Sequence, residues 1–279
     1  MTIEILNYLH RKGFRKTNSF LSKIGYRVKG FGHVKTVYHP GFRAYEYKVK
    51  EIVYMSAGPG WAYCYDYLKK ALQESYCYYY MPQPGNSVID IGAGLGEESV
   101  IFALLVGERG AVHAIEANPV SFAGLKYMRD QNKLTWMVPH QLAIYRENGS
   151  LSIEDNENDY ITNTIHENSG KPGCIQVPAK TLDTLVYENN ITRIDFLKSN
   201  IEGAEKYLIE GMSSSIDIIR NVCICCHDFR HIHHQDSEFY VTKKLVTSFL
   251  SKQGFEVKTR NTGNQCVDDY IYGRNVNLK

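Results

Sequence analysis

The feature that most constrains this sequence is a run of three glycines at alternate positions, Gly92, Gly94 and Gly96. A short apolar segment, SVIDI at 87–91, precedes them, and an apolar segment that favours a helix follows at 98–106. Glycine adopts backbone angles that other residues resist, and it lets the backbone approach a ligand closely. The pattern therefore predicts a strand, a glycine loop and a helix that together form a ligand site.

Short apolar segments alternate with helical patterns along the rest of the chain, which favours a doubly wound, mostly parallel sheet of the α/β class. Ligands of such sheets bind at the carboxyl ends of the strands. The expected strands are 87–93, 111–117, 136–144, 193–202 and 221–228, with shorter pieces at 151–155 and 174–179 and antiparallel closing strands at 257–260 and 270–274. The expected helices of this part are 98–106, 120–132 and 240–254.

The first 84 residues have a different pattern, and a proline- and glycine-rich break at 82–85 marks the predicted boundary. Trp61 and Tyr65 lie four residues apart and should share the buried face of a helix. We predict an α+β cap over residues 1–84, which contacts substrate or forms a homodimer, and a ligand-binding domain over residues 85–279. The cap should contain helices at 3–10 and 61–76 and half-buried strands at 33–38 and 45–54.

Charge is distributed unevenly. Residues 1–50 hold 11 Lys/Arg against only Glu4 and Glu46, a net +9, whereas the whole chain has a formal net charge of +2. A basic segment on an acidic body can contact nucleic acid, a membrane surface or a phosphorylated substrate. The ordinary alternative is a basic face that is simply solvated, and peripheral membrane contact through this segment stays open.

Composition limits the compartment and the class of protein. Apolar residues make up 43% and charged residues 22%, as in ordinary globular domains. We expect no transmembrane helix, because no uncharged apolar run reaches about 18 residues. The first residues, MTIEILNYLHRKGFRK, lack the apolar core of a secretory signal. Seven cysteines are an odd number and too few for a disulfide scaffold, so a reducing, cytoplasmic compartment is expected.

The glycine loop indicates which ligand it binds. Its spacing departs from the G-x-G-x-x-G of dinucleotide sites, and Glu97 and Glu98 would repel a pyrophosphate at the helix N-terminus. A ligand without phosphate and with a cationic centre, S-adenosylmethionine, fits better. Glu116 ends the second strand, 24 residues after Gly92, where a carboxylate can accept hydrogen bonds from both ribose hydroxyls.

Over about residues 86–257 the sequence resembles class I S-adenosylmethionine-dependent methyltransferases, and within them the FkbM type. The resemblance rests on VIDIGAGLGEES, AIEANP, QLAI, FLKSNIEGAEKYLIEGM and CHD. The family commonly has L-K-x-D-x-E-G-x-E in the fourth strand, and here Asn200 replaces the Asp. The resemblance implies a Rossmann-like fold with S-adenosyl-L-methionine as donor. It implies cofactor binding by Asp90, Gly92, Ala93, Gly94, Gly96, Glu98, Glu116, Ala117, Asn118, Gln141, Leu142, Ala143 and Asn200.

Polar residues at the ends of the fourth and fifth strands should face the methyl acceptor. We expect Lys198, Glu202 and His227 to be catalytic. By analogy with other O-methyltransferases of this fold, Asn200, His227 and Asp228 are candidate ligands for Mg²⁺ or Mn²⁺. Without a metal, His227 or Glu202 would act as the general base. The structural alternative is that Lys198, Glu202 and Glu205 form ion pairs and a helix-start carboxylate.

The histidines and cysteines near the fifth strand do not form a recognisable metal or redox motif. His227, His231, His233 and His234 lack the spacing of a structural zinc site, so we expect a loop over the acceptor. The cysteines at 223, 225 and 226 should pack in the core.

These observations favour an O-methyltransferase that acts on a sugar hydroxyl of a polysaccharide or glycosylated metabolite. The glycan or small-molecule acceptor follows from the resemblance alone. A nucleic-acid methyltransferase is an alternative that the basic N-terminal segment suggests, but the Asn/Asp-Pro-Pro-aromatic motif of base-modifying enzymes is missing after the fourth strand. A non-catalytic assembly partner that binds the cofactor is the third hypothesis.

Overall fold

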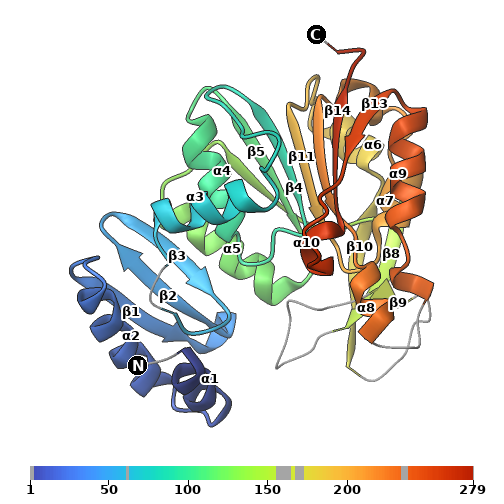
Figure 1. Ribbon diagram of the computed structural model, residues 1–279. Helices are drawn as coiled ribbons and strands as arrows, with labels where there is room; N and C mark the ends of the chain where they lie inside the picture. Colours follow the sequence, from blue (N-terminus) through green and yellow to red (C-terminus); the bar gives the residue numbers. More distant parts are fainter. Residues whose placement is uncertain (1–2, 61–62, 155–164, 167–172, 234–237, 279) are drawn as a thin grey trace.

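The computed structural model describes residues 3–60, 63–154, 165–166, 173–233 and 238–278 (Figure 1). Its helices are α1 Ile3–Arg11, α2 Arg15–Val28, α3 Tyr65–Glu74, α4 Glu97–Val106, α5 Pro119–Gln131, α6 Leu182–Glu188, α7 Glu205–Glu210, α8 Asp228–His233, α9 Lys243–Lys252 and α10 Gln265–Asp268. Its strands are β1 Val34–His39, β2 Ala44–Val49, β3 Ile52–Ser56, β4 Ser87–Ile91, β5 Ala111–Glu116, β6 Met137–Gln141, β7 Ala143–Ile144, β8 Gly149–Glu154, β9 Ile165–His166, β10 Cys174–Lys180, β11 Phe196–Asn200, β12 Asn221–Cys225, β13 Phe255–Lys258 and β14 Tyr270–Asn275. Short 3-10 turns occupy Pro40–Phe42, Ser215–Ile218 and Glu238–Tyr240.

The central sheet has the order β13-β14-β12-β11-β4-β5-β6. Strands β12, β11, β4, β5 and β6 pair in parallel, whereas β14 is antiparallel to both of its neighbours. The chain leaves β4 toward β5 on one side and returns later to β11 on the other. The carboxyl ends of β4 and β11 therefore meet at the point where strand order reverses, and crevices that bind ligands form there. The predicted fold class is confirmed.

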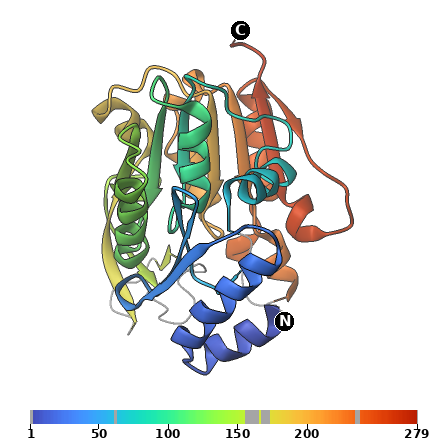
Figure 2. The ribbon, with the colours of Figure 1, turned by 90° about the vertical axis from the view of Figure 1, so that its left-hand side faces the viewer.

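The N-terminal residues build a second sheet, β1-β2-β3, which is antiparallel throughout. Helices α1 and α2 lie at the lower end of the molecule, on the side of this sheet that faces away from the central sheet (Figures 1 and 2). The strands β7, β10, β8 and β9 form a third sheet, in that order. None of the described helices combines the length and the apolar composition needed to cross a bilayer.

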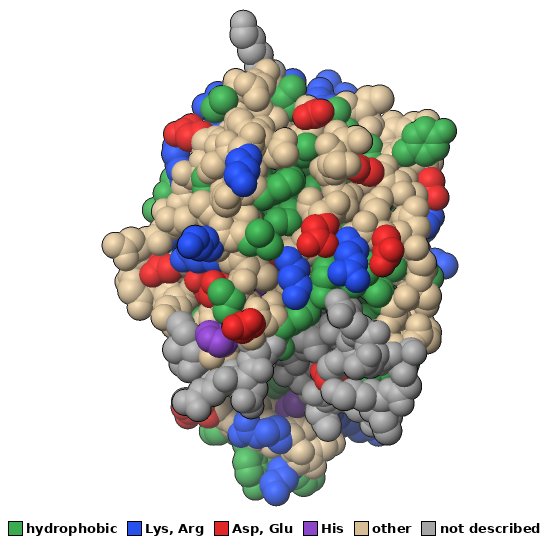
Figure 3. Space-filling model, turned by 90° about the vertical axis from the view of Figure 1, so that its right-hand side faces the viewer, with side chains coloured by type: hydrophobic (Ala, Val, Ile, Leu, Met, Phe, Trp, Pro, Cys, Tyr) green, Lys and Arg blue, Asp and Glu red, His purple; other side chains and the backbone are tan. Residues whose placement is uncertain are grey.

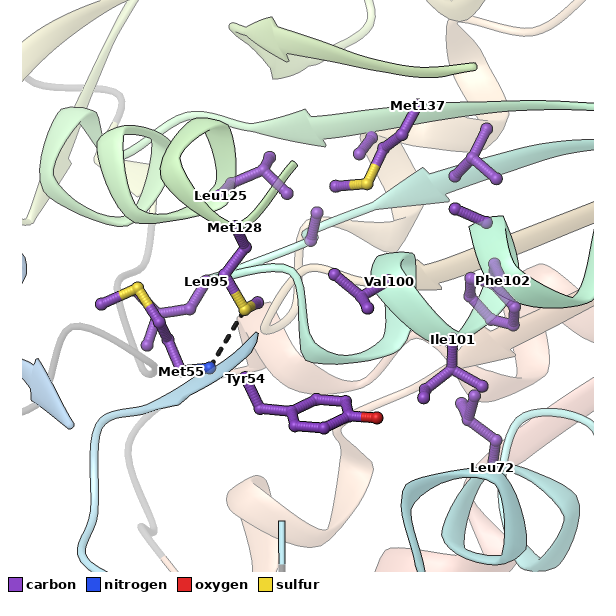
Figure 4. Close-up of a cluster of buried hydrophobic side chains, with 14 of the residues drawn as sticks. Tyr54, Met55, Leu72, Leu95, Val100, Ile101, Phe102, Leu125, Met128 and Met137 are labelled. Carbon is purple, nitrogen blue, oxygen red and sulfur yellow. Dashed lines mark hydrogen bonds between the residues drawn. The ribbon is translucent and has the colours of Figure 1, made fainter. Parts of the chain in front are cut away.

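The N-terminal sheet docks on the central domain through the backbone of β3. Val53 donates its N–H to Asn132 Oδ1 at 2.8 Å, and Asn132 Nδ2 donates to the Val53 carbonyl at 2.8 Å. Two residues on, the Met55 N–H points at Met128 Sδ at 3.0 Å (Figure 4). Buried side chains from both parts, among them Tyr54 and Leu125, belong to one hydrophobic cluster. The predicted boundary at residue 84 thus separates two sheets that share a core.

Several local predictions need correction. The segment 45–54 is a hairpin of β2 and β3 rather than one strand, because Lys50 adopts a left-handed φ of 56° and turns the chain. The helix expected at 61–76 begins at Tyr65, and Trp61 lies outside the described residues. The expected histidine loop contains α8, while His234 also falls outside the described part. The cysteines at 223, 225 and 226 are buried, as expected.

The docking contact generates a stability prediction. Replacing Asn132 with Ala leaves the outward N–H and C=O of the buried residue Val53 without their partners, and this should reduce the free energy of unfolding by about 2 kcal/mol. Urea denaturation followed by circular dichroism measures the change. Gln131→Ala, an exposed neighbour on the same helix, is the matched control and should be neutral. Equal stability of the two variants would contradict this account of docking.

Candidate functional site

The glycine loop follows β4 and owes its shape to steric limits. Gly92 has a φ of +73°, and a Cβ there would lie 2.0 Å from the Asn200 carbonyl oxygen, so the loop can approach β11 only as glycine. Gly96 caps α4 with a φ of +92°, and a Cβ there would lie 2.5 Å from Leu125 Cδ1. Gly94 differs from both, because a Cβ at this position would meet nothing within 4 Å among the described residues. Gly92 and Gly96 thus serve close packing, whereas Gly94 faces open space.

Glu116 fixes the far side of the loop. Its Oε2 accepts a hydrogen bond from the Gly94 N–H at 2.8 Å, and its Oε1 accepts one from the Asn118 N–H at 2.7 Å. Burial raises the pKa of Glu116, although these two backbone hydrogen bonds oppose the shift. Each carboxylate oxygen has two lone pairs, so each can accept one further hydrogen bond from a ligand.

A cavity of about 200 Å³ lies between the glycine loop and the carboxyl ends of β5 and β11. Its lining combines apolar side chains with the carboxylates of Glu97, Glu98, Glu116 and Glu202. The lining consists of Ala57, Ile91, Gly92, Ala93, Gly94, Leu95, Glu97, Glu98, Ile115, Glu116, Ala117, Asn118, Leu142, Ala143, Ile144, Ile153, Lys198, Asn200, Ile201, Glu202 and Ala204. Asn200 Oδ1 is buried in this region and has no hydrogen-bond partner among the described residues, so it is available to a ligand.

Lys198 and Asp90 form a fully buried ion pair beneath the cavity. Lys198 Nζ lies 2.8 Å from Asp90 Oδ1 and donates to the Gly92 carbonyl at 3.0 Å, while Ser99 Oγ donates to Asp90 Oδ2 at 2.5 Å. Burial lowers the pKa of Lys198, but the charges of Asp90 and Glu98 outweigh it, so the balance is upward. The ammonium is therefore charged and holds β11, β4 and the glycine loop together.

A second charged cluster follows β11 and β12. Buried His227 places Nδ1 2.9 Å from Glu205 Oε1 and Nε2 3.4 Å from Glu202 Oε1. Arg230 Nη1 lies 3.0 Å from the other oxygen of Glu202. Burial alone would lower the pKa of His227, but the hydrogen bonds to Glu202 and Glu205 and their charges raise it to about 9. The ring is thus an imidazolium at neutral pH, and Glu202 lies between two cations.

Glu97 is the carboxyl group in the cavity whose charge is least compensated. It begins α4, and its Oε1 is buried with no hydrogen-bond partner among the described residues. Burial and the charge of Glu98 raise the pKa of Glu97 to about 8, although Ser56 on the N-terminal sheet partly opposes the shift. This group can therefore exchange a proton close to neutral pH.

Comparison with known proteins places this site in a family. Residues 90–257 match the FkbM methyltransferase domain, and they include the glycine loop, Glu116 and both charged clusters. The chain belongs to the FkbM methyltransferase family. The chain is 23% identical to the hexuronic acid methyltransferase AglP of Haloferax volcanii over 67% of this chain and 70% of that protein. It is 24% identical to Methyltransferase 1 of Beauveria bassiana over 69% of this chain and 81% of that protein. Fibrillarin of Aeropyrum pernix, solved with S-adenosyl-L-methionine, aligns with a TM-score of 0.45 at 12% identity over 86% of this chain and 98% of that one.

Most of the residues that the FkbM motifs assign to the site line this cavity. Of the residues predicted to be catalytic or to bind the cofactor, those that line the cavity are Gly92, Ala93, Gly94, Glu98, Glu116, Ala117, Asn118, Leu142, Ala143, Lys198, Asn200 and Glu202. Asp90 lies beneath the cavity and Gly96 packs on α5, while Gln141 is exposed at the end of β6. His227 lies outside the lining, behind Glu202 and Glu205.

The sequence interpretation did not assign the lining residues Ala57, Ile91, Leu95, Glu97, Ile115, Ile144, Ile153, Ile201 and Ala204 to the site. The glycine loop contains Leu95, and the motif QLAI already includes Ile144. Glu97 was noted only as an obstacle to pyrophosphate. Nothing in the sequence pointed to Ala57, because it reaches the cavity from the end of β3, on the other sheet.

The structure does not support the predicted Mg²⁺ or Mn²⁺ site. Asp228 Oδ2 accepts the N–H groups of Thr242 and Lys243, both at 3.0 Å, at the start of α9. His227 has a carboxylate at each ring nitrogen. Across the described part of the chain, no three His, Cys, Asp or Glu side chains are grouped so that they could hold one ion. Asn200 therefore stands without the two predicted co-ligands.

The charge on His227 can be measured directly. Because its pKa is raised from 6.5 to about 9, the stabilisation it provides is complete below pH 6.5 and is lost as the pH rises through about 9. Long-range ¹H–¹⁵N spectra of the ring should show both nitrogens protonated at neutral pH. His227→Gln assigns the signal, and Glu205→Gln should lower the midpoint because it removes one carboxylate. A neutral His227 ring at pH 7 would refute this assignment and restore it as a candidate base.

Proposed function

We propose that this protein transfers a methyl group from S-adenosylmethionine to a hydroxyl group of a sugar. The observation that carries the proposal is the cavity at the strand-order reversal, where Gly94 faces open space and the buried Asn200 Oδ1 lacks a partner. Both features suit a bound molecule better than an empty turn. Membership of the FkbM methyltransferase family supports the transferred group.

The residues of the cavity fit this donor. Glu116 keeps acceptor capacity for two ribose hydroxyls, and Asn200 Oδ1 can accept from an amino group. Leu142, Ala143 and Ile144 offer apolar surface to an adenine ring. The bound donor supplies an electrophilic methyl on a sulfonium cation, and the carboxylates near the cavity favour that positive charge.

The acceptor hydroxyl must lose a proton as it attacks the methyl group. His227 is protonated and cannot accept one, and Glu202 already faces His227 and Arg230. Glu97 has a buried, unpartnered oxygen within the cavity lining. We therefore assign the proton of the acceptor to a Glu97 carboxylate oxygen. A sugar acceptor is supported by the relative from Haloferax volcanii, which is named for hexuronic acid methylation.

Donor binding tests the first half of the proposal. Gly94→Ala places a methyl group in the open space beside the loop and should weaken binding of S-adenosylhomocysteine at least about tenfold, or 1.4 kcal/mol, in calorimetry. Gly263→Ala is the matched control, since Gly263 has a similar left-handed φ of +79° and open surroundings away from the cavity. The proposal fails if wild-type protein gives no heat with S-adenosylhomocysteine, or if both variants lose the same affinity.

The second half is tested with labelled donor and a panel of hexuronic-acid and neutral-hexose glycosides. With Glu97 as base, the rate should rise as the pH increases through about 8 and then level off, since the carboxylate is the active form. Glu97→Gln should reduce turnover about 10²- to 10⁴-fold.

Two controls separate the loss of the base from a loss of structure. Glu97→Gln should keep its affinity for S-adenosylhomocysteine, and Glu108→Gln, an exposed residue just beyond the same helix, should keep full activity. Undiminished turnover in Glu97→Gln would remove Glu97 from this role without affecting the proposed donor site.

A further inference from the structure

Helix α2 packs on the N-terminal sheet with polar side chains inward and apolar side chains outward, the reverse of the usual arrangement. The side chains it buries include Asn18, Ser19 and Ser22. Its apolar side chains Phe20 and Val28 point outward, with 62% and 80% of their surface exposed, and Ile24 between them is 43% exposed. Positions 20, 24 and 28 lie one turn apart and form a single outward ridge.

Asn18 holds the buried side of α2 by hydrogen bonds, whereas its Oδ1 and the hydroxyls of Ser19 and Ser22 have no hydrogen-bond partner among the described residues. Asn18 Nδ2 donates to the Leu6 carbonyl at 3.0 Å and to the Tyr45 hydroxyl at 3.1 Å. Tyr26, on the same face, is fully buried against Tyr47 with ring centroids 5.7 Å apart. The Asn18 Nδ2 hydrogen bonds and the buried Tyr26 ring fix this face of α2 toward the sheet, so the exposed apolar ridge is left to a partner outside the described chain.

Basic side chains run beside the ridge. Lys16, Lys23 and Arg27 are exposed on the adjacent line of α2, and residues 5–45 contain nine Lys/Arg without one Asp or Glu. Exposed Tyr8 on α1 and Phe14 after it add apolar surface at the same end of the molecule. Figure 3 shows Lys/Arg and hydrophobic side chains side by side at this lower end, where Figure 1 has α1.

We propose that the outer face of α1 and α2 binds the surface of an anionic lipid bilayer, with the ridge of Phe20, Ile24 and Val28 among the acyl chains and the lysines at the headgroups. An exposed apolar face flanked by basic residues is the arrangement that interfacial helices use. A symmetric dimer would bring the same basic residues of two copies together, which is unfavourable. Nucleic acid would use the charge but would leave the aliphatic part of the ridge, Ile24 and Val28, uncovered.

Vesicle cosedimentation of the full chain tests the proposal. The protein should bind vesicles that mix phosphatidylglycerol with phosphatidylcholine, and it should bind phosphatidylcholine alone at least about tenfold more weakly. Substituting Lys16, Lys23 and Arg27 together with Gln should weaken binding about 100-fold, at about fivefold for each charge. Substituting Phe20, Ile24 and Val28 together with Ser should abolish sedimentation, and all six side chains are exposed, so thermal unfolding should not change.

The matched control replaces three exposed apolar residues elsewhere, Tyr187, Leu245 and Val276, with Ser, and it should bind as the wild type does. Equal vesicle binding by the ridge variant and the control would overturn the proposal. So would binding of RNA without binding of vesicles. A dimer in light scattering that the ridge substitutions dissociate, again without vesicle binding, would assign the ridge to a second copy of the chain instead.

Discussion

The buried ion pair between Lys198 and Asp90 is the interaction on which the site depends. Removing two charges from water is expensive, and only good geometry with further hydrogen bonds compensates for it. Here Asp90 also accepts from Ser99, and Lys198 also donates to the Gly92 carbonyl. The pair joins β4, β11 and the first turn of the glycine loop where strand order reverses. Loss of either partner would leave an uncompensated charge at that junction.

Pairing of charges also decides which groups in the cavity can react. Lys198 is neutralised by Asp90, and Glu202 by His227 and Arg230. Glu116 is fixed by two backbone N–H groups. Glu97 remains with a buried oxygen that no described residue contacts through a hydrogen bond. A cavity arranged in this way favours a cationic ligand and leaves Glu97 Oε1 available for proton transfer.

The sequence alone predicted the central sheet and the glycine loop because both follow from local patterns. Strand and helix periodicity is written into consecutive residues, and Gly92 is required by a close approach that its motif encodes. The charge state of His227 could not be predicted, because it depends on Glu205, 22 residues away in sequence. The raised pKa of Glu97 was also hidden, because its first cause is burial, and burial depends on how distant segments pack around the glycine loop. Pairings between distant side chains carry no periodic signal.

The N-terminal sheet lies between the cavity and the outer face of α2, and the family motifs cover neither contribution. One end of β3 docks on α5 through Asn132, and Ala57, just beyond its other end, lines the cavity beside the glycine loop. Part of the cavity lining therefore comes from a segment outside the family match at 90–257. The same sheet carries α2 with its apolar ridge turned outward. One small sheet thus connects a residue of the cavity lining with the surface proposed to bind the membrane.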